Sequence, residues 1–212
     1  MSELETPRDG TGMEPRGHTL RTRRGPVDVL FYEASGAKAG VVWVGGVGGG
    51  FDTPARELYP RLGEELLHHG LSSLRVKYRN PTDLSQAVHD VLAGVDFLVE
   101  HGLERVALVG HSFGGAVMID AGAQSPWVTT VVALAPQSYG TEAVSELPPR
   151  SLLLVHGLSD AVLPPSCSLT IYERARGKKD LELIPGAGHV LNEDAQRVFT
   201  RVRDWLLHEL RG

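Results

Sequence analysis

A serine with a glycine two positions before it and another two positions after it stands near the middle of the sequence. Residues 110–114 read Gly-His-Ser-Phe-Gly and match the pattern G-x-S-x-G around Ser112. The apolar run before them predicts a strand and the small residues after them predict a helix, so we expect Ser112 at a tight strand-to-helix turn. Such a turn pushes the hydroxyl away from the backbone, as a nucleophile requires. The alternative is that Ser112 only caps the helix, which serine does often.

A serine hydroxyl is a weak nucleophile near neutral pH and needs a base within hydrogen-bonding distance. The sequence holds nine histidines. Of these, His189 lies in a glycine-rich loop between the last predicted strand and the last predicted helix, which returns it to the strand ends where Ser112 lies. We therefore predict that His189 is the base. His111 and His156 stand close to the motifs, but we predict packing or hydrogen-bonding roles for both.

A histidine base needs a carboxylate that fixes its tautomer and stabilises its cation. Asp160 stands at the end of the sequence Leu-Val-His-Gly-Leu-Ser-Asp, shortly after a predicted buried strand and therefore in another strand-end loop. We predict that Asp160 orients His189. The alternative for Asp160 is an aspartate that closes an Asx turn or caps a helix.

Negative charge develops on a substrate oxygen during acyl transfer, and backbone N–H groups can stabilise it. The loop Gly-Gly-Val-Gly-Gly-Gly at residues 45–50 follows the second predicted strand, and we predict Val47 as one donor. The N–H of Phe113, at the start of the helix after Ser112, is predicted to be the other. A phosphate-binding loop would need the pattern G-x-x-x-x-G-K-[ST], which the sequence lacks, and the glycines fit G-x-G-x-x-G only loosely.

Alternating strands and helices are predicted to bring these loops together. Short β-branched runs that alternate with amphipathic helical patterns indicate an α/β fold: a mostly parallel sheet with helices on both faces, whose sites form at the carboxyl ends of the strands. The predicted strands cover residues 27–32, 40–44, 71–78, 106–109, 131–134, 152–155 and 181–184. The predicted helices cover residues 53–70, 83–101, 114–124, 168–176 and 193–210.

The composition favours one globular domain. A chain of 212 residues with 42% hydrophobic residues can bury one substantial core, so we expect a single domain at residues 18–212. Residues 1–17 are polar and are expected to form a flexible tail. The net charge of −5 leaves no broad basic surface for nucleic acid. A solvated strand edge explains the one basic cluster, which consists of Arg16, Arg21, Arg23 and Arg24.

The sequence favours a protein without membrane, metal or cofactor partners. No apolar run approaches the length of a membrane span, and residues 1–17 lack the apolar stretch of a secretory signal. The single cysteine, Cys167, excludes an internal disulfide and favours a reducing, cytoplasmic location. No H-x-x-H or C-x-x-C cluster supplies metal ligands, so we expect neither a metal nor a cofactor. We expect a monomer or a homodimer.

Four segments together resemble the α/β-hydrolase superfamily: GHSFGG around Ser112, HGLSD around Asp160, GAGH around His189, and the loop GGVGGG. The order Ser, Asp, His along the chain is that of the superfamily. The resemblance covers roughly residues 27–210 and is to compact members without a cap, near the dienelactone hydrolases and acyl esterases. It implies an ester or thioester hydrolase that is acylated at Ser112 and deacylated by water. Dienelactone hydrolases use a cysteine nucleophile, so Ser112 argues against that particular activity.

The site is expected to be open. Only about seventeen residues separate the strand predicted at 131–134 from the one at 152–155, where the α/β-hydrolase fold usually inserts its cap, so we expect no lid domain. An open site suits a small or medium acyl group. The candidate pocket residues, each of which also fits ordinary core or rim packing, are Gly46, Phe51, Tyr139, Leu163 and Val190.

Three functions remain open from the sequence. The first is an esterase that acts on a small-molecule ester. The second is a peptidase or an acyltransferase on the same triad, because a triad fixes acyl chemistry without fixing the leaving group or the acceptor. The third is a binding protein that keeps the fold without hydrolysis, although such a protein has no physical need for Ser112, Asp160 and His189 together.

Overall fold

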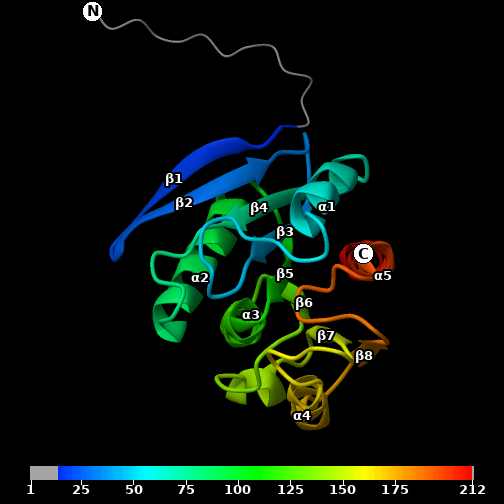
Figure 1. The fold of residues 1–212 in the computed structure, drawn as a ribbon. Coiled ribbons are helices and arrows are strands. Elements are labelled where there is room, and N and C mark those ends of the chain that lie inside the picture. Colours follow the sequence, from blue (N-terminus) through cyan, green and yellow to red (C-terminus); the bar gives the residue numbers. More distant parts are fainter. Residues whose placement is uncertain (1–13, 212) are drawn as a thin grey trace, which may run out of the picture.

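One sheet runs through the molecule. The computed structural model describes residues 14–211. Its strands are β1 (Arg16–Thr22), β2 (Gly25–Tyr32), β3 (Ala39–Val44), β4 (Ser72–Val76), β5 (Arg105–His111), β6 (Val128–Leu134), β7 (Ser151–Gly157) and β8 (Lys179–Ile184). These eight strands lie in the order β1-β2-β4-β3-β5-β6-β7-β8 (Figure 1). β2 pairs antiparallel with β1 and with β4, and every other neighbouring pair is parallel.

Helices cover both faces of this sheet. On one face lie α1 (Leu58–Leu67) and α5 (Ala195–Leu210). On the other lie α2 (Leu84–Glu100), α3 (Phe113–Gln124), α4 (Ser166–Arg174) and a short 3-10 helix (Glu142–Glu146). Figure 1 shows the sheet between these two layers. The predicted α/β fold, with a mostly parallel sheet and helices on both faces, is confirmed.

The central strands are buried on both faces, as their continuous apolar sequences predict. Along β3, Trp43 packs into the cluster under α1 and α5, whereas Val42 and Val44 pack into the cluster under α2 and α3. All six residues of β3 are buried. Parallel strands need this double coverage because their crossover helices lie on both faces of the sheet.

The predicted tail and the first strand need a correction. The first thirteen residues of the expected tail lie outside the described residues, but β1 begins at Arg16, so Arg16 and Gly17 belong to the sheet. Strand β1 is an edge strand whose residues are mostly exposed, which places Arg16 and Arg21 on the solvated strand edge that the sequence suggested. Charged side chains on an edge strand discourage pairing with another chain.

The start of α1 also differs from the prediction. The helical pattern from residue 53 led us to expect a helix beginning near Pro54, but α1 begins at Leu58. Ala55, Arg56 and Glu57 have φ values of 50°, 51° and 61°, so three consecutive residues other than glycine take the left-handed conformation. Such a turn cannot continue into a right-handed helix without a break.

Helix α2 is tied to the end of β4 by a buried ion pair. Its N-cap residue, Asp83, accepts a hydrogen bond from the backbone N–H of Gln86, as expected for a helix that begins after aspartate. Within the helix, the Asp90 side chain is fully buried and accepts from the Nε of Arg79 at 2.7 Å and from its backbone N–H at 2.9 Å. This pair fixes the helix against the loop that follows β4.

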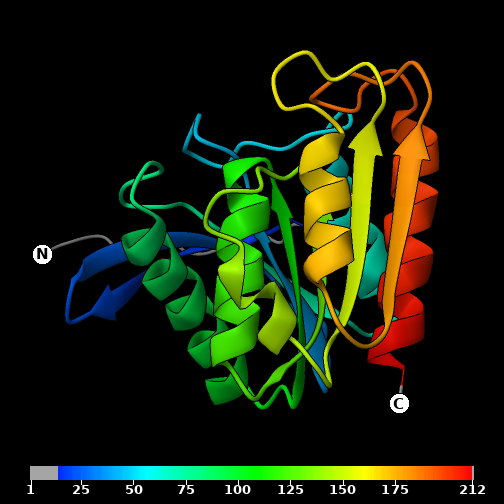
Figure 2. The same ribbon diagram turned by 90° about the horizontal axis from the view of Figure 1, so that it is seen from below.

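The functional loops gather at one edge of the sheet. Figure 2 shows β7 (yellow) and β8 (orange) ending at the same edge, and the loops after β3, β7 and β8 lie there together. The connection between β6 and β7 holds only the short 3-10 helix (Glu142–Glu146), so the expected absence of a lid in this connection is confirmed. Within residues 14–211, no helix is long and apolar enough to cross a membrane.

Candidate active site

Ser112 occupies a strained turn between β5 and α3. Its φ of 56° and ψ of −118° lie in a region that residues with a side chain rarely adopt. A Cβ on Gly110 would lie 2.2 Å from the carbonyl oxygen of Gly114, and a Cβ on Gly114 would lie 2.3 Å from the carbonyl oxygen of Gly45. Both positions of the G-x-S-x-G pattern therefore require glycine, because any larger residue collides with backbone.

His189 reaches Ser112 from the loop after β8. Its Nε2 lies 3.1 Å from the Ser112 Oγ, which is hydrogen-bonding distance. The backbone carbonyl of His189 lies 2.9 Å from the Nε2 of His111, so His111, which precedes Ser112, holds the loop of His189. Ser112 and His189 therefore lie next to each other, as the sequence predicted.

Asp160 completes the chain of hydrogen bonds. Its Oδ2 lies 2.8 Å from the Nδ1 of His189, and its Oδ1 accepts from the backbone N–H groups of Val162 at 2.8 Å and Leu163 at 2.9 Å. Burial alone would raise the pKa of Asp160, but the hydrogen bonds from His189 and from these N–H groups outweigh it and hold the pKa below its usual value. Asp160 is therefore ionised at neutral pH.

His111 is buried beside His189. The two rings have centroids 4.8 Å apart. The Nε2 of His111 donates to the carbonyl of His189, whereas no residue from 14 to 211 gives its buried Nδ1 a hydrogen-bond partner. Burial lowers the pKa of His111 to about 4, so this ring is neutral at neutral pH. It fixes the loop of His189 without adding a positive charge beside it.

The loop after β3 passes beside Ser112. A Cβ built on Gly46 would lie 3.4 Å from the Cβ of Ser112, so the backbone of this loop runs against the turn. The side chain of Val47 is 57% exposed. Phe113 is the first residue of α3, where an N–H has no partner within the helix. The donor roles of Val47 and Phe113 stay predictions.

The other predicted pocket residues lie in different surroundings. Val190 follows His189 directly and is 44% exposed, and Tyr139 is 79% exposed. Leu163 donates its N–H to Asp160. Phe51 packs over Arg75 of β4, with the guanidinium carbon 5.6 Å from the ring centroid, and its carbonyl accepts from that guanidinium. Their role in binding a substrate stays a prediction.

A contact that the sequence did not reveal joins the loop after β3 to the loop of His189. The N–H of Ala55 donates to the carbonyl of Val190 at 2.7 Å, and the N–H of Arg56 donates to the Oδ1 of Asn192 at 2.9 Å. These donors belong to the left-handed turn before α1. The three residues at positive φ in this turn gave no signal in the sequence, because left-handed conformations are normally signalled by glycine or asparagine.

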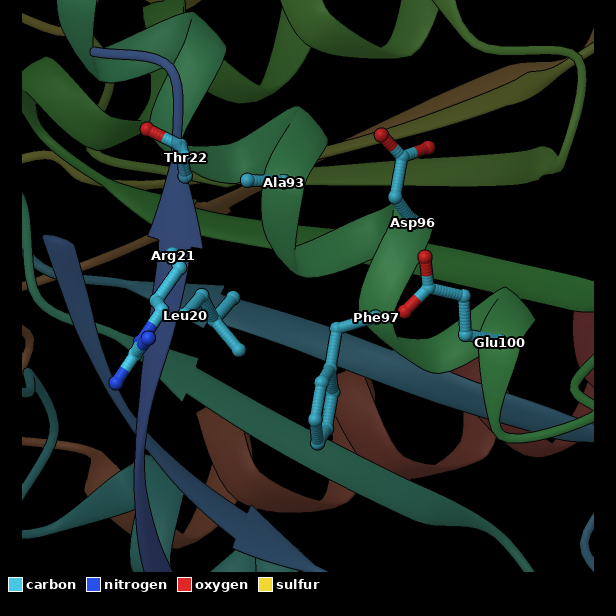
Figure 3. A pocket seen from close by; sticks show the side chains of 7 residues that line it. All are labelled: Leu20, Arg21, Thr22, Ala93, Asp96, Phe97 and Glu100. Atoms are coloured by element: carbon cyan, nitrogen blue, oxygen red, sulfur yellow. The ribbon is translucent and has the colours of Figure 1, made fainter. Parts of the chain in front are cut away.

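A separate hollow lies between β1 and α2, where none of the predicted site residues occurs. Its volume is about 290 Å³ (Figure 3). In Figure 3, the side chain of Arg21 extends away from the carboxylates of Asp96 and Glu100. The residues that line it are Leu20, Arg21, Thr22, Ala93, Asp96, Phe97 and Glu100.

The comparisons with known proteins point to the fold. No model of a known protein family and no curated protein matches the sequence.

Among residues 14–211, no group of three or more His, Cys, Asp or Glu side chains is arranged to hold a metal ion. The expected lack of a metal stays a prediction.

Several solved structures resemble the structure of this protein over almost the full length of the chain. Dienelactone hydrolase from Anabaena variabilis ATCC 29413 has a TM-score of 0.81 at 20% identity, with 93% of this chain and 100% of that chain covered. Est1E from Butyrivibrio proteoclasticus has a TM-score of 0.81 at 16% identity, covering 92% of this chain and 99% of that chain. The esterase domain of a Rhodothermus marinus protein has a TM-score of 0.75 at 18% identity, covering 93% and 100%. The chain thus has the α/β-hydrolase fold, in the compact form that it shares with dienelactone hydrolase.

Proposed function

We propose that the protein is a serine hydrolase that cleaves a carboxylic ester or thioester with a small to medium acyl group. The observation that carries the proposal is the continuous chain from the Ser112 Oγ through His189 to Asp160, with distances of 3.1 Å and 2.8 Å. A nucleophile, a base within reach and a carboxylate that orients the base are the parts that acyl transfer needs.

Acylation begins when the Ser112 Oγ attacks the carbonyl carbon of the substrate and its proton passes to the Nε2 of His189. The π electrons of the carbonyl move to its oxygen, and the N–H groups of Val47 and Phe113 stabilise the resulting oxyanion. When the carbonyl re-forms, the bond to the leaving alcohol or thiol breaks. The leaving group takes the proton from His189, and an acyl group stays on Ser112.

Deacylation repeats these steps with water. His189 accepts a proton from the attacking water, a second tetrahedral intermediate forms, and its collapse returns the proton to the Ser112 Oγ. The ionised Asp160 stabilises the cation of His189 in both halves of the reaction. The carboxylic acid then leaves.

The surroundings of the triad support an apolar acyl group. Val47, Val162, Val190 and Tyr139 are large apolar or aromatic side chains exposed on the loops at the catalytic edge. Val162 donates its N–H to Asp160 and Val190 follows His189, so both lie beside the triad. Apolar side chains there would bind an acyl chain by excluding water from it.

The proposal is tested by hydrolysis of p-nitrophenyl acetate, butyrate and octanoate by the wild-type protein and by Ser112→Ala. We expect the wild-type protein to hydrolyse at least one ester and the variant to lose at least about 1,000-fold in kcat. The chain-length preference gives the size of the pocket. Equal activity of the two proteins would contradict the proposal. If only Ser112 labelling by a fluorophosphonate is seen, the ester assignment fails, and peptides and acyl acceptors become the next substrates.

A further inference from the structure

A second buried histidine lies behind the predicted acid. His156 is the penultimate residue of β7, four positions before Asp160, and its side chain is fully buried. Its Nε2 lies 3.0 Å from the carbonyl oxygen of Leu163 and 3.2 Å from the Oδ2 of Asp160. On the far side of the ring, its Nδ1 lies 2.7 Å from the Oγ of Ser168 in α4, which is buried as well.

These neighbours assign the proton on the ring. The Nε2 faces only oxygens that accept, so it carries the hydrogen. It donates this hydrogen to the carbonyl of Leu163, and the ionised carboxylate of Asp160 lies 3.2 Å away. The Nδ1 then accepts from the hydroxyl of Ser168. Burial lowers the pKa of His156, which keeps the ring in this neutral form at neutral pH.

His156 thereby contacts one oxygen of the Asp160 carboxylate and holds the residue that bonds the other oxygen. The Oδ2 that receives the hydrogen bond of His189 also faces the Nε2 of His156. The Oδ1 accepts from the N–H of Leu163, and the carbonyl of that same Leu163 accepts from His156. The N–H group of His156 therefore lies against the Oδ2 of Asp160 and also holds Leu163, which bonds the Oδ1.

We infer that His156 is a positioning residue that holds Asp160 in the orientation that His189 needs, with Ser168 fixing its tautomer. This inference rests on the proposed function. Without the N–H at Nε2, the carboxylate keeps its contacts to Val162 and Leu163 but loses the support on the oxygen that bonds His189. A carboxylate that turns out of line no longer fixes the tautomer of the base.

Two substitutions separate this role from simple packing. His156→Gln places an amide nitrogen as many bonds from the Cα as the Nε2, so it keeps a donor towards Asp160. His156→Asn places its amide where the Nδ1 lies, so it keeps the contact with Ser168 and loses the donor towards Asp160. The two variants are measured with p-nitrophenyl butyrate, with the rate of labelling of Ser112 by a fluorophosphonate, and with thermal unfolding.

We expect His156→Gln to stay within about threefold of the wild-type kcat, and His156→Asn to lose about 10- to 100-fold in kcat with little change in KM, since a hydrogen bond to a charged group is removed. The labelling rate should fall in parallel. If His156→Asn does not fold, His156→Met, which fills similar space without a donor, should show the same loss.

Equal kcat values in the folded variants, or losses that follow only their thermal stability, would overturn the role of His156. That result is distinct from failure of the proposed function. If Ser112→Ala is as active as the wild-type protein, the triad itself is wrong. If Ser112→Ala is inactive and the His156 variants all match the wild-type protein, the triad stands and this inference fails.

Discussion

Ser112 holds a backbone conformation that costs free energy, with φ at 56° and ψ at −118°. Residues with a Cβ avoid this region because the Cβ approaches the backbone, whereas glycine enters it freely. The fold keeps the strain because the turn between β5 and α3 is packed from both sides by Gly110 and Gly114. Such strain is often stored where a side chain has to be presented to a substrate.

The strain predicts a difference between two inactive variants. Ser112→Gly and Ser112→Ala both remove the hydroxyl, but only the glycine variant removes the Cβ. We expect Ser112→Gly to be more stable than Ser112→Ala by about 1 kcal/mol, after the greater freedom of glycine in the unfolded chain is subtracted. Urea unfolding of the two variants measures the difference, and a less stable glycine variant would show that the turn is not strained.

His111 makes stability depend on pH. Burial lowers its pKa from 6.5 to about 4, so between these values the unfolded chain binds a proton that the folded protein does not. The free energy of unfolding is therefore fully retained above pH 6.5 and falls as the pH drops towards 4, by about 3 kcal/mol from this residue. The lowered pKa of His156 acts in the same direction.

His111→Gln tests this dependence, because the amide of glutamine can still donate to the carbonyl of His189 but does not titrate. Between pH 7 and pH 4, the variant should lose less stability than the wild-type protein. Urea unfolding at a series of pH values measures both curves. Parallel curves would mean that His111 is not the group responsible.

The sequence predicted that Ser112, Asp160 and His189 lie together, but not the contacts that support them. Ser112, Asp160 and His189 each follow a strand, and parallel strands end at one edge of a sheet, so their meeting follows from local patterns. The bond from His111 to the carbonyl of His189 joins residues 78 positions apart. It depends on how two loops pack, and no local pattern reports that packing.

Among the elements, α2 carries two aspartates in opposite environments. Asp90 is buried and paired with Arg79, so its loss leaves a guanidinium without its charge partner. Asp96 lies at the surface, where partial desolvation of its carboxyl group and the nearby Glu100 both raise its pKa. A raised pKa in an acid means that ionisation at neutral pH works against folding.

The same substitution should therefore have opposite effects at the two positions. Asp90→Asn is expected to lower the free energy of unfolding at pH 7 by about 3 to 5 kcal/mol, the usual cost of breaking a buried pair. Asp96→Asn should leave the melting temperature unchanged or raise it slightly. Thermal unfolding of both variants checks this, and equal losses would show that the burial of the pair does not govern the stability of α2.

The predicted elements failed where local signals were weak or misleading. Strand β1 reads Arg-Gly-His-Thr-Leu-Arg-Thr, which has no alternation of apolar and polar residues because both of its faces are largely exposed. Helix α1 was predicted to begin too early because the helical spacing of its apolar residues was extended back over residues 55–57, which form a left-handed turn. The left-handed turn there is fixed by Ala55 and Arg56 bonding to the loop of His189, which is a tertiary effect.

In the whole molecule, as described for residues 14–211, the short connection between β6 and β7 places no lid over the edge where Ser112 and His189 lie. In an enzyme with a lid that opens at the surface of substrate droplets, the closed lid keeps dissolved substrate out of the active site. The activity of such an enzyme therefore rises abruptly when the substrate forms droplets. We expect this protein to hydrolyse tributyrin with a rate that saturates smoothly through the solubility limit of the substrate. A sharp rise at that limit, measured by titrating the released acid, would point to a segment that covers the site.

We propose that His189, oriented by Asp160, activates Ser112. The most direct measurement is intact-protein mass spectrometry after reaction with a fluorophosphonate, followed by peptide mapping, for the wild-type protein and for Ser112→Ala, His189→Ala and Asp160→Asn. We expect one adduct on Ser112 in the wild-type protein, none in Ser112→Ala, and much slower labelling in His189→Ala and Asp160→Asn. Labelling at another residue, or labelling of Ser112 that is independent of His189, would contradict it.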